Sequence, residues 1–464
     1  MLLITAVLYR RLALRLALFG VCGLAVAARA AFWTTAYYPG YEQEYMLPAS
    51  NINFTAVTHV IHFSLVPNSD GTFNSNVNFI TWQNSTNLIA LAHAAGVKVL
   101  ITVGGGGSET GFQGSTSPGN LPVFINNLTN FVATRGYDGL DLDWEPCPSS
   151  DFQLFTNLVT GLRSALNQLG RPKLLTVAAE AYPPYGDSAT AEYTMFAAFQ
   201  SQFDQINIMT YDLSGPYEGW VTWFNSPIYD GGYRFPSSGG LVPSINGAVG
   251  NFLMYGASPG KLAVGMAFYG YVWTDGTGSS PSSITQPRQS WINAPTITAV
   301  RYTDIMADYY KSNLYQWDLS AQAAYLSITN AAVTNNAFIS YDDQRACQAK
   351  VSFARNNNLG GVMIWELGQD HQAGTPDPLL EAVKQALATP GRSTVQFSGH
   401  DLTVAFQTIP LGSYEVQWSS NLASGFWNSL LTTNITGLGG TLQVKDSGAL
   451  TNQPTRFYRI LTPP

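Results

Sequence analysis

Charged residues are scarce in this chain of 464 residues. Asp, Glu, Lys and Arg together make up 11% of it, against about a quarter in an ordinary globular protein. With 29 acidic and 22 basic residues, the formal net charge is −7. Such a surface offers no basic patch to neutralise phosphates, so nucleic-acid binding is not expected. It suits an uncharged partner that is bound through hydrogen bonds.

Cysteine and histidine are also few, with three and five residues. Three cysteines cannot build a disulfide framework, and we expect Cys147 and Cys347 to be free thiols. The histidines show no HExxH or similar spacing, so no catalytic metal is expected. A run of four glycines approaches the spacing of a phosphate-binding loop, but Phe112 stands where that loop needs Lys. The sequence therefore predicts neither a metal nor a cofactor.

The first thirty residues have the features of an export signal. Arginines at 10, 11 and 15 precede an apolar run over 16–27, and residues 28–30 have the small-x-small pattern of a cleavage site. The run is short for a membrane span, although a retained N-terminal anchor is the alternative. We expect segment 1–30 to be removed, which would take the net charge from −7 to −11 because it holds four arginines and no acid. The mature protein is then expected to be a secreted or periplasmic monomer without stable membrane association.

Apolar runs alternate with helical patterns over residues 31–390. The runs that predict strands are 32–38, 58–66, 98–105, 139–145, 173–181, 205–212, 261–270 and 360–368. Helical periodicity follows most of them, and this alternation predicts parallel strands with helical crossovers. We expect an α/β fold, a (β/α)8 TIM barrel, with an insertion of about 272–337 between strands 7 and 8. A doubly wound open sheet is the alternative.

The pattern changes after a break at Thr389-Pro390-Gly391. The runs 414–418, 439–446 and 456–460 alternate apolar and polar residues between Gly- and Asn-rich turns. They predict a small β-sandwich-like module over 391–464. Trp418 and Trp427 are sugar platforms in one interpretation and core or attachment residues in the other, which we favour.

The predicted strand 139–145 carries three acids two residues apart, Asp141, Asp143 and Glu145. Side chains alternate along a strand, so these three share one face, which points inward in a barrel. Burial and like charge both favour the protonated form, so at least one carboxyl should keep a proton near neutral pH. General-acid cleavage of an acetal needs such a group. In the structural alternative, the three acids form a buried network that supports a loop. Asp138 belongs to the other face of the strand, and we expect it to orient the start of the strand.

Several motifs carry a resemblance to a known family. The run from Asp138 to Glu145 resembles the DGxDxDxE signature of glycoside hydrolase family 18, the chitinases and their relatives. Further pieces follow in the family's order, namely 102–105 for its SxGG strand, 209–212 for its MxYD strand, 225–229 for its N-[AS]-P-L-Y loop and Trp365 in its last strand. The resemblance covers about 31–388 and implies the barrel fold and glycoside hydrolysis.

The resemblance also implies a role for each catalytic residue. Glu145 would protonate the glycosidic oxygen, while the substrate's own 2-acetamido carbonyl would attack the anomeric carbon. Asp143 would orient the acetamido group and stabilise the oxazolinium ion, and Asp141 would share its proton. Tyr211 would donate to the acetamido carbonyl. The implied substrate contacts are Trp365 as the floor of the subsite, with Met209, Asp212, Tyr217, Gly104 and Gly105 around it.

Three functions fit this resemblance. The first is a secreted chitinase that hydrolyses β-1,4 linkages between N-acetylglucosamine residues of chitin or chitooligosaccharides. An endo-β-N-acetylglucosaminidase or a peptidoglycan-directed hydrolase would use the same chemistry. A non-catalytic chitin-binding lectin is the third, and the presence of Glu145 argues against it. The segment His62-Phe63-Ser64 and Glu180 depart from the family pattern, and Glu180 either tunes the subsite or meets solvent.

Overall fold

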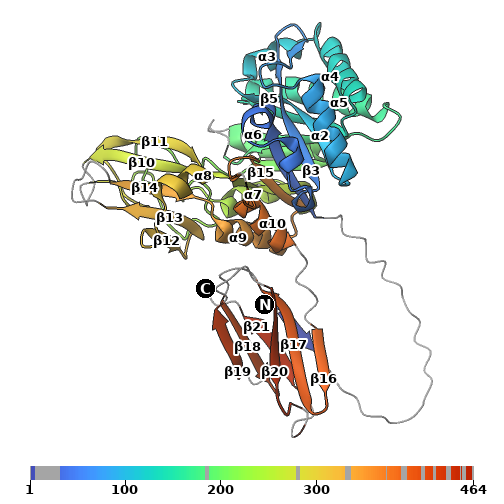
Figure 1. Ribbon diagram of the computed structural model, residues 1–464. Helices are drawn as coiled ribbons and strands as arrows, with labels where there is room; N and C mark the ends of the chain where they lie inside the picture. The colour runs from blue at the N-terminus through green and yellow to red at the C-terminus, as the bar shows by residue number, and fades with distance from the viewer. Residues whose placement is uncertain are drawn as a thin grey trace, which may run out of the picture. The chain divides into compact units, whose positions relative to one another are not determined.

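The computed structural model describes residues 2–5, 32–182, 188–277, 283–329, 336–372, 374–387, 394–408, 413–421, 425–434, 440–449, 451 and 456–461. The chain forms two compact units, Ala30–Lys384 and a second that joins Met1–Arg29 to Gln385–Pro464. The expected cleavage site at 28–30 and the break at 389–391 lie outside the described residues. Each unit is a fold in its own right (Figure 1).

Eight parallel strands close into a barrel in the larger unit (Figure 1). They are β2 (Trp33–Pro39), β3 (His59–Pro67), β5 (Lys98–Gly106), β6 (Gly139–Glu145), β7 (Leu174–Glu180), β8 (Gln205–Met209), β9 (Leu262–Ala267) and β15 (Gly361–Trp365). The first strand, β2, pairs with both β15 and β3, which closes the sheet. A two-residue strand, β4 (Phe73–Asn74), adds to β3. The predicted TIM barrel is confirmed, and the open sheet is excluded.

Helices alternate with the barrel strands. They are α1 (Gly40–Tyr45), α2 (Trp82–Ala94), α3 (Glu109–Ser115), α4 (Leu121–Arg135), α5 (Phe152–Asn167), α6 (Ser188–Phe199), α7 (Ile245–Met254), α9 (Gln344–Asn356) and α10 (Pro378–Leu387). Helix α4 ends where Gly136 takes a φ of 85°, which only glycine adopts without strain. On β6, the outward-facing Trp144 stacks on Phe112 of α3, with 4.5 Å between ring centroids. The apolar side chains at alternate positions of β6 thus face the helices, as the sequence predicts.

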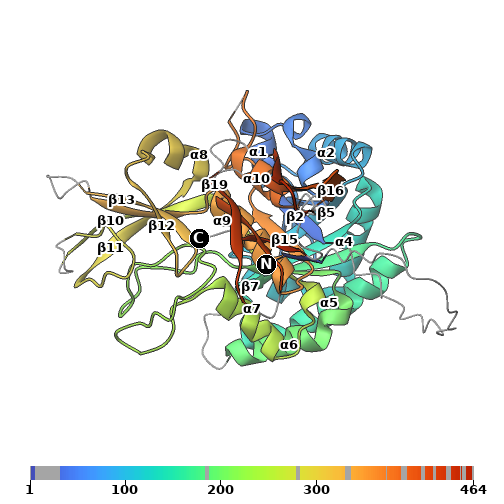
Figure 2. The ribbon, with the colours of Figure 1, turned by 90° about the horizontal axis from the view of Figure 1, so that it is seen from below.

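The insertion between β9 and β15 is one antiparallel sheet, which lies to one side of the barrel (Figure 2). Its strands are β10 (Tyr269–Thr277), β11 (Asn293–Arg301), β12 (Tyr315–Asp318), β13 (Ala323–Ile328) and β14 (Ala337–Tyr341), with the short helical segments α8 (Tyr302–Asp304) and 305–309 after β11. The sheet spans residues 269–341, a longer range than the expected 272–337, because only Phe268 separates β9 from β10. Its first residues therefore stand at the mouth of the barrel.

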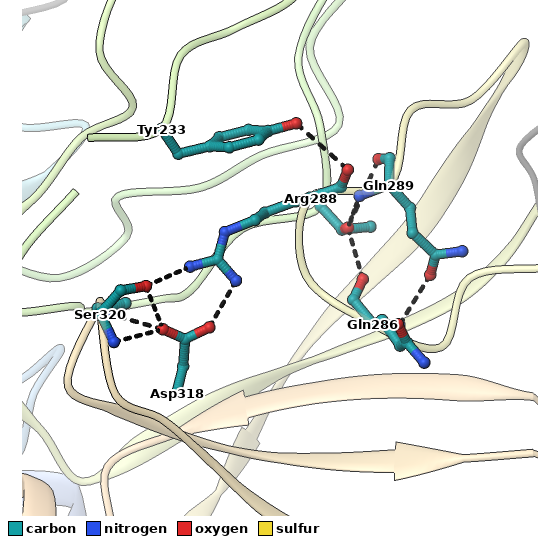
Figure 3. A network of polar contacts seen from close by, with 8 residues as sticks. Tyr233, Gln286, Arg288, Gln289, Asp318 and Ser320 are labelled. Atoms are coloured by element: carbon teal, nitrogen blue, oxygen red, sulfur yellow. Dashed lines mark hydrogen bonds and ion pairs between the residues drawn. The ribbon is translucent and has the colours of Figure 1, made fainter. Parts of the chain in front are cut away.

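The long loop between β8 and α7, residues 210–244, is tied to this sheet by Arg288 (Figure 3). The guanidinium donates to the Asp318 carboxylate at 2.5 Å and lies 5.1 Å from the ring centroid of Trp223. The backbone carbonyl of Arg288 accepts from the Tyr233 hydroxyl at 3.4 Å. Trp223 is completely buried in a cluster with Trp and Phe rings of the insertion. The loop is therefore part of a packed core, so the residues it presents to the barrel have fixed positions.

The smaller unit consists of two antiparallel sheets, with strand orders β1-β21-β18-β19 and β16-β17-β20. Their bounds are β1 (Leu2–Thr5), β16 (Thr394–Ser398), β17 (Asp401–Thr408), β18 (Ser413–Ser419), β19 (Asn428–Asn434), β20 (Gly440–Asp446) and β21 (Phe457–Leu461). Trp418 packs against the core that the two sheets share, and Arg456 covers its ring at 4.0 Å. Strand β1 lies in the segment that the sequence predicts is removed, so its loss would expose the edge of β21. No helix of the described ranges is both long and apolar enough to cross a membrane.

Candidate active site

Asp141 is the innermost acid of β6 and is completely buried. Its carboxyl accepts hydrogen bonds from Tyr37 at 3.0 Å, Thr102 at 3.1 Å and Thr176 at 2.6 Å, which lie on three other barrel strands. Burial raises the pKa of Asp141 to about 6, and the three hydrogen bonds oppose the rise. Three donors therefore fix this carboxyl at the centre of the barrel. The sequence pattern did not identify Tyr37 as its partner.

Asp143 lies one step further toward the carboxyl end of β6 and is 3% exposed. Burial first, and then the charges of Glu145 and Asp141, raise its pKa well above the usual range. Asp143 and Glu145 share a side-chain hydrogen bond, so the proton that Asp143 keeps lies between the two carboxyls. Within the described residues the Oδ1 atom of Asp143 has no hydrogen-bond partner. A buried oxygen without a partner is costly, and a ligand that donates there would relieve that cost.

Glu145 ends β6 and is only partly buried. Burial raises its pKa, the hydrogen bond with Asp143 lowers it, and the charge of Asp212 raises it further. The three acids of β6 thus lie on one inward face, and the outermost can reach a ligand. Asp138, at the other end of the strand, accepts from the backbone N–H of Val99 at 2.8 Å and from His93 at 2.8 Å, which orients the strand entry as expected.

Tyr211 follows β8 and faces the outer acids across the barrel mouth. It is 8% exposed, and burial followed by the charges of Glu145 and Asp143 raises its pKa well above the usual range. The hydroxyl is therefore neutral and can donate. It lies 3.8 Å from the sulfur of Met363, which is a weak acceptor, so a ligand oxygen would be the better partner.

Asp212 occupies a left-handed turn, with a φ of 56°, directly after Tyr211. Its carboxylate accepts from the hydroxyls of Tyr269 at 2.5 Å and Tyr271 at 2.6 Å, and its N–H donates to the Asn225 side chain at 2.9 Å. The two tyrosines are two residues apart at the start of β10, so their side chains lie on the same face of the insertion sheet and both reach Asp212. Sequence reasoning missed both, although their i, i+2 spacing at the start of a strand was a usable signal.

These groups surround a cavity of about 670 Å³. Its wall is formed at the carboxyl ends of the barrel strands, which is where barrel enzymes carry their sites. Of the residues that the sequence singled out, the wall includes Asp143, Glu145, Met209, Tyr211, Asp212, Tyr217 and Trp365. It also includes Tyr37, Glu180, Tyr182 and Trp220. Carboxylates and aromatic rings dominate this wall, and no Lys, Arg or His of the described ranges lines it.

The Trp365 ring is held edge-on by two aromatic neighbours. The ring of Phe63 lies at 4.9 Å and that of Tyr37 at 5.5 Å between centroids. Phe63 belongs to the segment that departs from the family pattern, and it supports the tryptophan. Its neighbour His62 is fully buried and contacts the Tyr137 hydroxyl at 2.7 Å, and burial lowers its pKa to about 3. The departure therefore leaves the aromatic floor of the cavity intact.

Gly104 and Gly105 are not among the residues that line the cavity. Both have positive φ, 116° and 111°. A Cβ atom on Gly104 would come within 1.9 Å of the Asp143 carbonyl oxygen, and one on Gly105 within 2.7 Å of the Phe63 ring. They allow β5 to pack closely against Asp143 and Phe63, and so they support the wall from outside it.

The residues that the structure describes do not form a metal site. No group of three or more His, Cys, Asp or Glu side chains within the described ranges could hold a metal ion. Cys147 and Cys347 are free thiols, the first partly and the second completely buried. The site is therefore built from carboxyl, phenol and indole groups.

Comparison with known proteins identifies the family. Residues 34–370 match the model of the glycosyl hydrolases family 18. The chain belongs to this family. Its most similar relatives include Chitinase A1 of Niallia circulans, 29% identical over 76% of this chain and 54% of that protein. The Class V chitinase of Arabidopsis thaliana is 28% identical over 63% of this chain and 75% of that protein. The chain thus matches about half the length of Chitinase A1.

Solved family 18 structures have the same fold. The Group IV chitinase of Ostrinia furnacalis in complex with allosamidin superposes with a TM-score of 0.62, at 22% identity, over 77% of this chain and 99% of that one. A family 18 N-acetylglucosaminidase of Paenibacillus barengoltzii superposes with a TM-score of 0.62, at 24% identity, over 76% of this chain and 99% of that one. At these identities the likeness shows the fold alone.

Proposed function

We propose that the protein is a secreted chitinase, which hydrolyses β-1,4 linkages between N-acetylglucosamine residues with retention of configuration. One observation carries the proposal: Asp143, Glu145 and Tyr211 surround one cavity, and the acid pair keeps a proton there. The Trp365 ring offers an uncharged sugar face a stacking surface. The relatives named chitinases support the choice of substrate.

In the first step the shared proton of the acid pair moves from Glu145 to the glycosidic oxygen. The bond between that oxygen and the anomeric carbon breaks, and the carbonyl oxygen of the 2-acetamido group bonds to the anomeric carbon. The Tyr211 hydroxyl donates to this carbonyl, and the unpartnered Oδ1 of Asp143 accepts the acetamido N–H. Asp143, now ionised, stabilises the positive oxazolinium ion that results.

In the second step water attacks the anomeric carbon from the side that the leaving group vacated. Glu145, now a carboxylate, accepts the proton of that water. The oxazolinium ring opens, the acetamido group is restored, and the acid pair has recovered its proton. Asp141 keeps its position deeper in the barrel than Asp143 through both steps, because Tyr37, Thr102 and Thr176 donate hydrogen bonds to its carboxyl.

A matched pair of enzymes tests this function. The wild-type protein and Glu145→Gln are incubated with colloidal chitin, chitin hexasaccharide, a high-mannose glycopeptide and peptidoglycan, and the products are separated by chromatography. We expect chitooligosaccharides from the wild type and a loss of turnover of about 10²–10⁴ in the variant, as for removal of a general acid. Circular dichroism should show both proteins folded.

Other results would point elsewhere. Near-normal turnover by Glu145→Gln would refute the role of that acid. Products from the glycopeptide or from peptidoglycan alone would favour the second function, which uses the same chemistry. Saturable chitin binding without any product would make the protein a lectin.

Secretion belongs to the same proposal. Its support is the basic, apolar and small-x-small order of residues 1–30. N-terminal sequencing of exported protein is expected to begin at Ala31. A mature chain that begins at Met1 would contradict removal and would keep β1 in the smaller unit.

A further inference from the structure

Glu180, whose role the sequence left open, ends β7 beside the end of β6. The parallel register pairs Asp141 with Thr176 and Leu142 with Val177, a constant offset of 35 residues. The pairing ends there, and Glu145 and Glu180 are the last residues of the two neighbouring strands. Adjacent strands lie about 4.8 Å apart, and both side chains line the same cavity. Glu180 is therefore the neighbour of the proposed general acid.

A second cavity, of about 20 Å³, lies behind Glu180 and has room for about one water molecule. Glu180 lines it together with Trp144, Cys147 and Glu192. Glu192, on α6, is 7% exposed, and burial raises its pKa well above the usual range, so this carboxyl is neutral. The Trp144 indole N–H is buried and has no partner in the described part of the chain. The other residues that line this cavity are apolar, so this side of Glu180 offers it no compensating charge.

No cation of the described ranges lines either cavity around Glu180. The titratable groups that line these cavities with it are Tyr37 on β2, Asp143 and Glu145 on β6, Cys147 after β6, Tyr182 after β7, Glu192 on α6, and Tyr211, Asp212 and Tyr217 after β8. Burial first, and then the charge of Glu145, raise the pKa of Glu180 to about 7. Two neighbouring carboxyls without a cation lose their last common proton only at a raised pH.

We propose that Glu180 is a positioning residue for the proposed chitinase, because its carboxylate, in the cavity that Asp143 and Glu145 line, disfavours loss of the proton that this acid pair shares. Glu145 thereby keeps a proton for the glycosidic oxygen at a higher pH than it would alone. The number of protons on the enzyme is unchanged over a cycle, since Glu145 gives one in the first step and regains one from water in the second. The inference rests on the proposed function for its kinetic readout only.

The kinetic test compares the pH profiles of kcat and kcat/KM for the wild type and Glu180→Gln on a chitooligosaccharide. Glutamine keeps the shape and removes the charge, so the alkaline limb of the variant should move to lower pH by about one unit. Glu180→Asp, which restores a carboxyl, should recover part of the shift. The matched control is Asp308→Asn, which removes one charge from an exposed site of the insertion and should leave the limb in place.

A second measurement does not depend on turnover. In protein labelled with ¹³C-glutamate, the Glu145 carboxyl resonance is assigned by its absence from Glu145→Gln, and its titration is followed in wild type and Glu180→Gln. A lower final midpoint in Glu180→Gln supports the proposed role of Glu180. An unchanged midpoint, or a uniform loss of kcat at every pH with the limb in place, would reduce Glu180 to a structural residue. If the wild type cleaves no chitin substrate, the proposed function fails while the titration still decides the pair.

Discussion

Two clusters of buried acids occupy this barrel, and only one of them lines the large cavity. The first is the column on β6. The second consists of Glu42, Glu366 and Asp370, which are 1%, 3% and 1% exposed. None of these three lines the cavity of about 670 Å³. Burial of carboxyls by itself therefore does not indicate a catalytic site.

Each cluster combines held and unmatched oxygens. Glu366 accepts from Tyr41 at 3.2 Å and from Gln369 at 2.7 Å. Asp370 accepts the backbone N–H groups that open α10, at 2.9 and 3.0 Å, which satisfies a helix N-terminus. Within the described residues, Oε2 of Glu42 and Oδ1 of Asp143 both lack a hydrogen-bond partner, but only Asp143 lines the cavity. The position of an unmatched oxygen beside a cavity, and not its presence alone, lets the acid act on a ligand.

Removing the charge of Asp143 tests the first cluster through catalysis. Asp143→Asn keeps an acceptor for the acetamido N–H but cannot carry the negative charge opposite the oxazolinium ion. We expect kcat to fall by about 10²–10³, as when one electrostatic partner of a transition state is lost. Steady-state kinetics on chitin hexasaccharide measures this, with thermal unfolding to verify the fold. The comparison breaks if Asp143→Asn turns over at the wild-type rate.

Truncating Glu366 should test the second cluster through stability. Glu366→Ala leaves Glu42 and the Tyr41 hydroxyl buried without their partner, which should cost roughly 1–3 kcal/mol in the free energy of unfolding. Urea denaturation measures it, and Glu44→Ala, at an exposed acid on the same helix, is the control. Equal stability of Glu366→Ala and wild type would show that the second cluster is not structural.

A third test concerns the pH dependence of stability. Burial, and then the charge of Glu366, raise the pKa of Glu42 to about 10. Since the folded state binds this proton more tightly than the unfolded chain, the free energy of unfolding should fall as pH rises from about 5 to 10. Glu42→Gln, which stays neutral, should flatten that decline in a series of thermal unfolding scans. Parallel slopes for the variant and the wild type would contradict the raised pKa of Glu42.

Local pattern predicted the barrel strands well, because buried parallel strands read as short apolar runs. It was less successful where polar residues begin an element. Helix α2 starts at Trp82, although its apolar pattern begins only at Leu88, because the Thr81 side chain caps a first turn that is polar in sequence. In the smaller unit β16, β17 and β19 were not predicted, although Leu402, Val404 and Phe406 stand at alternate positions of β17 and are buried.

The sequence by itself determined the acid column, since the period of two in a strand places Asp141, Asp143 and Glu145 on one face wherever that strand lies. Only the tertiary structure decided their partners. Tyr37 and Tyr269 lie 104 and 57 residues from the carboxyls they contact, and Glu145 and Glu180, at the ends of neighbouring strands, line one cavity. Such meetings depend on barrel closure and on the insertion that follows β9, which no local pattern contains.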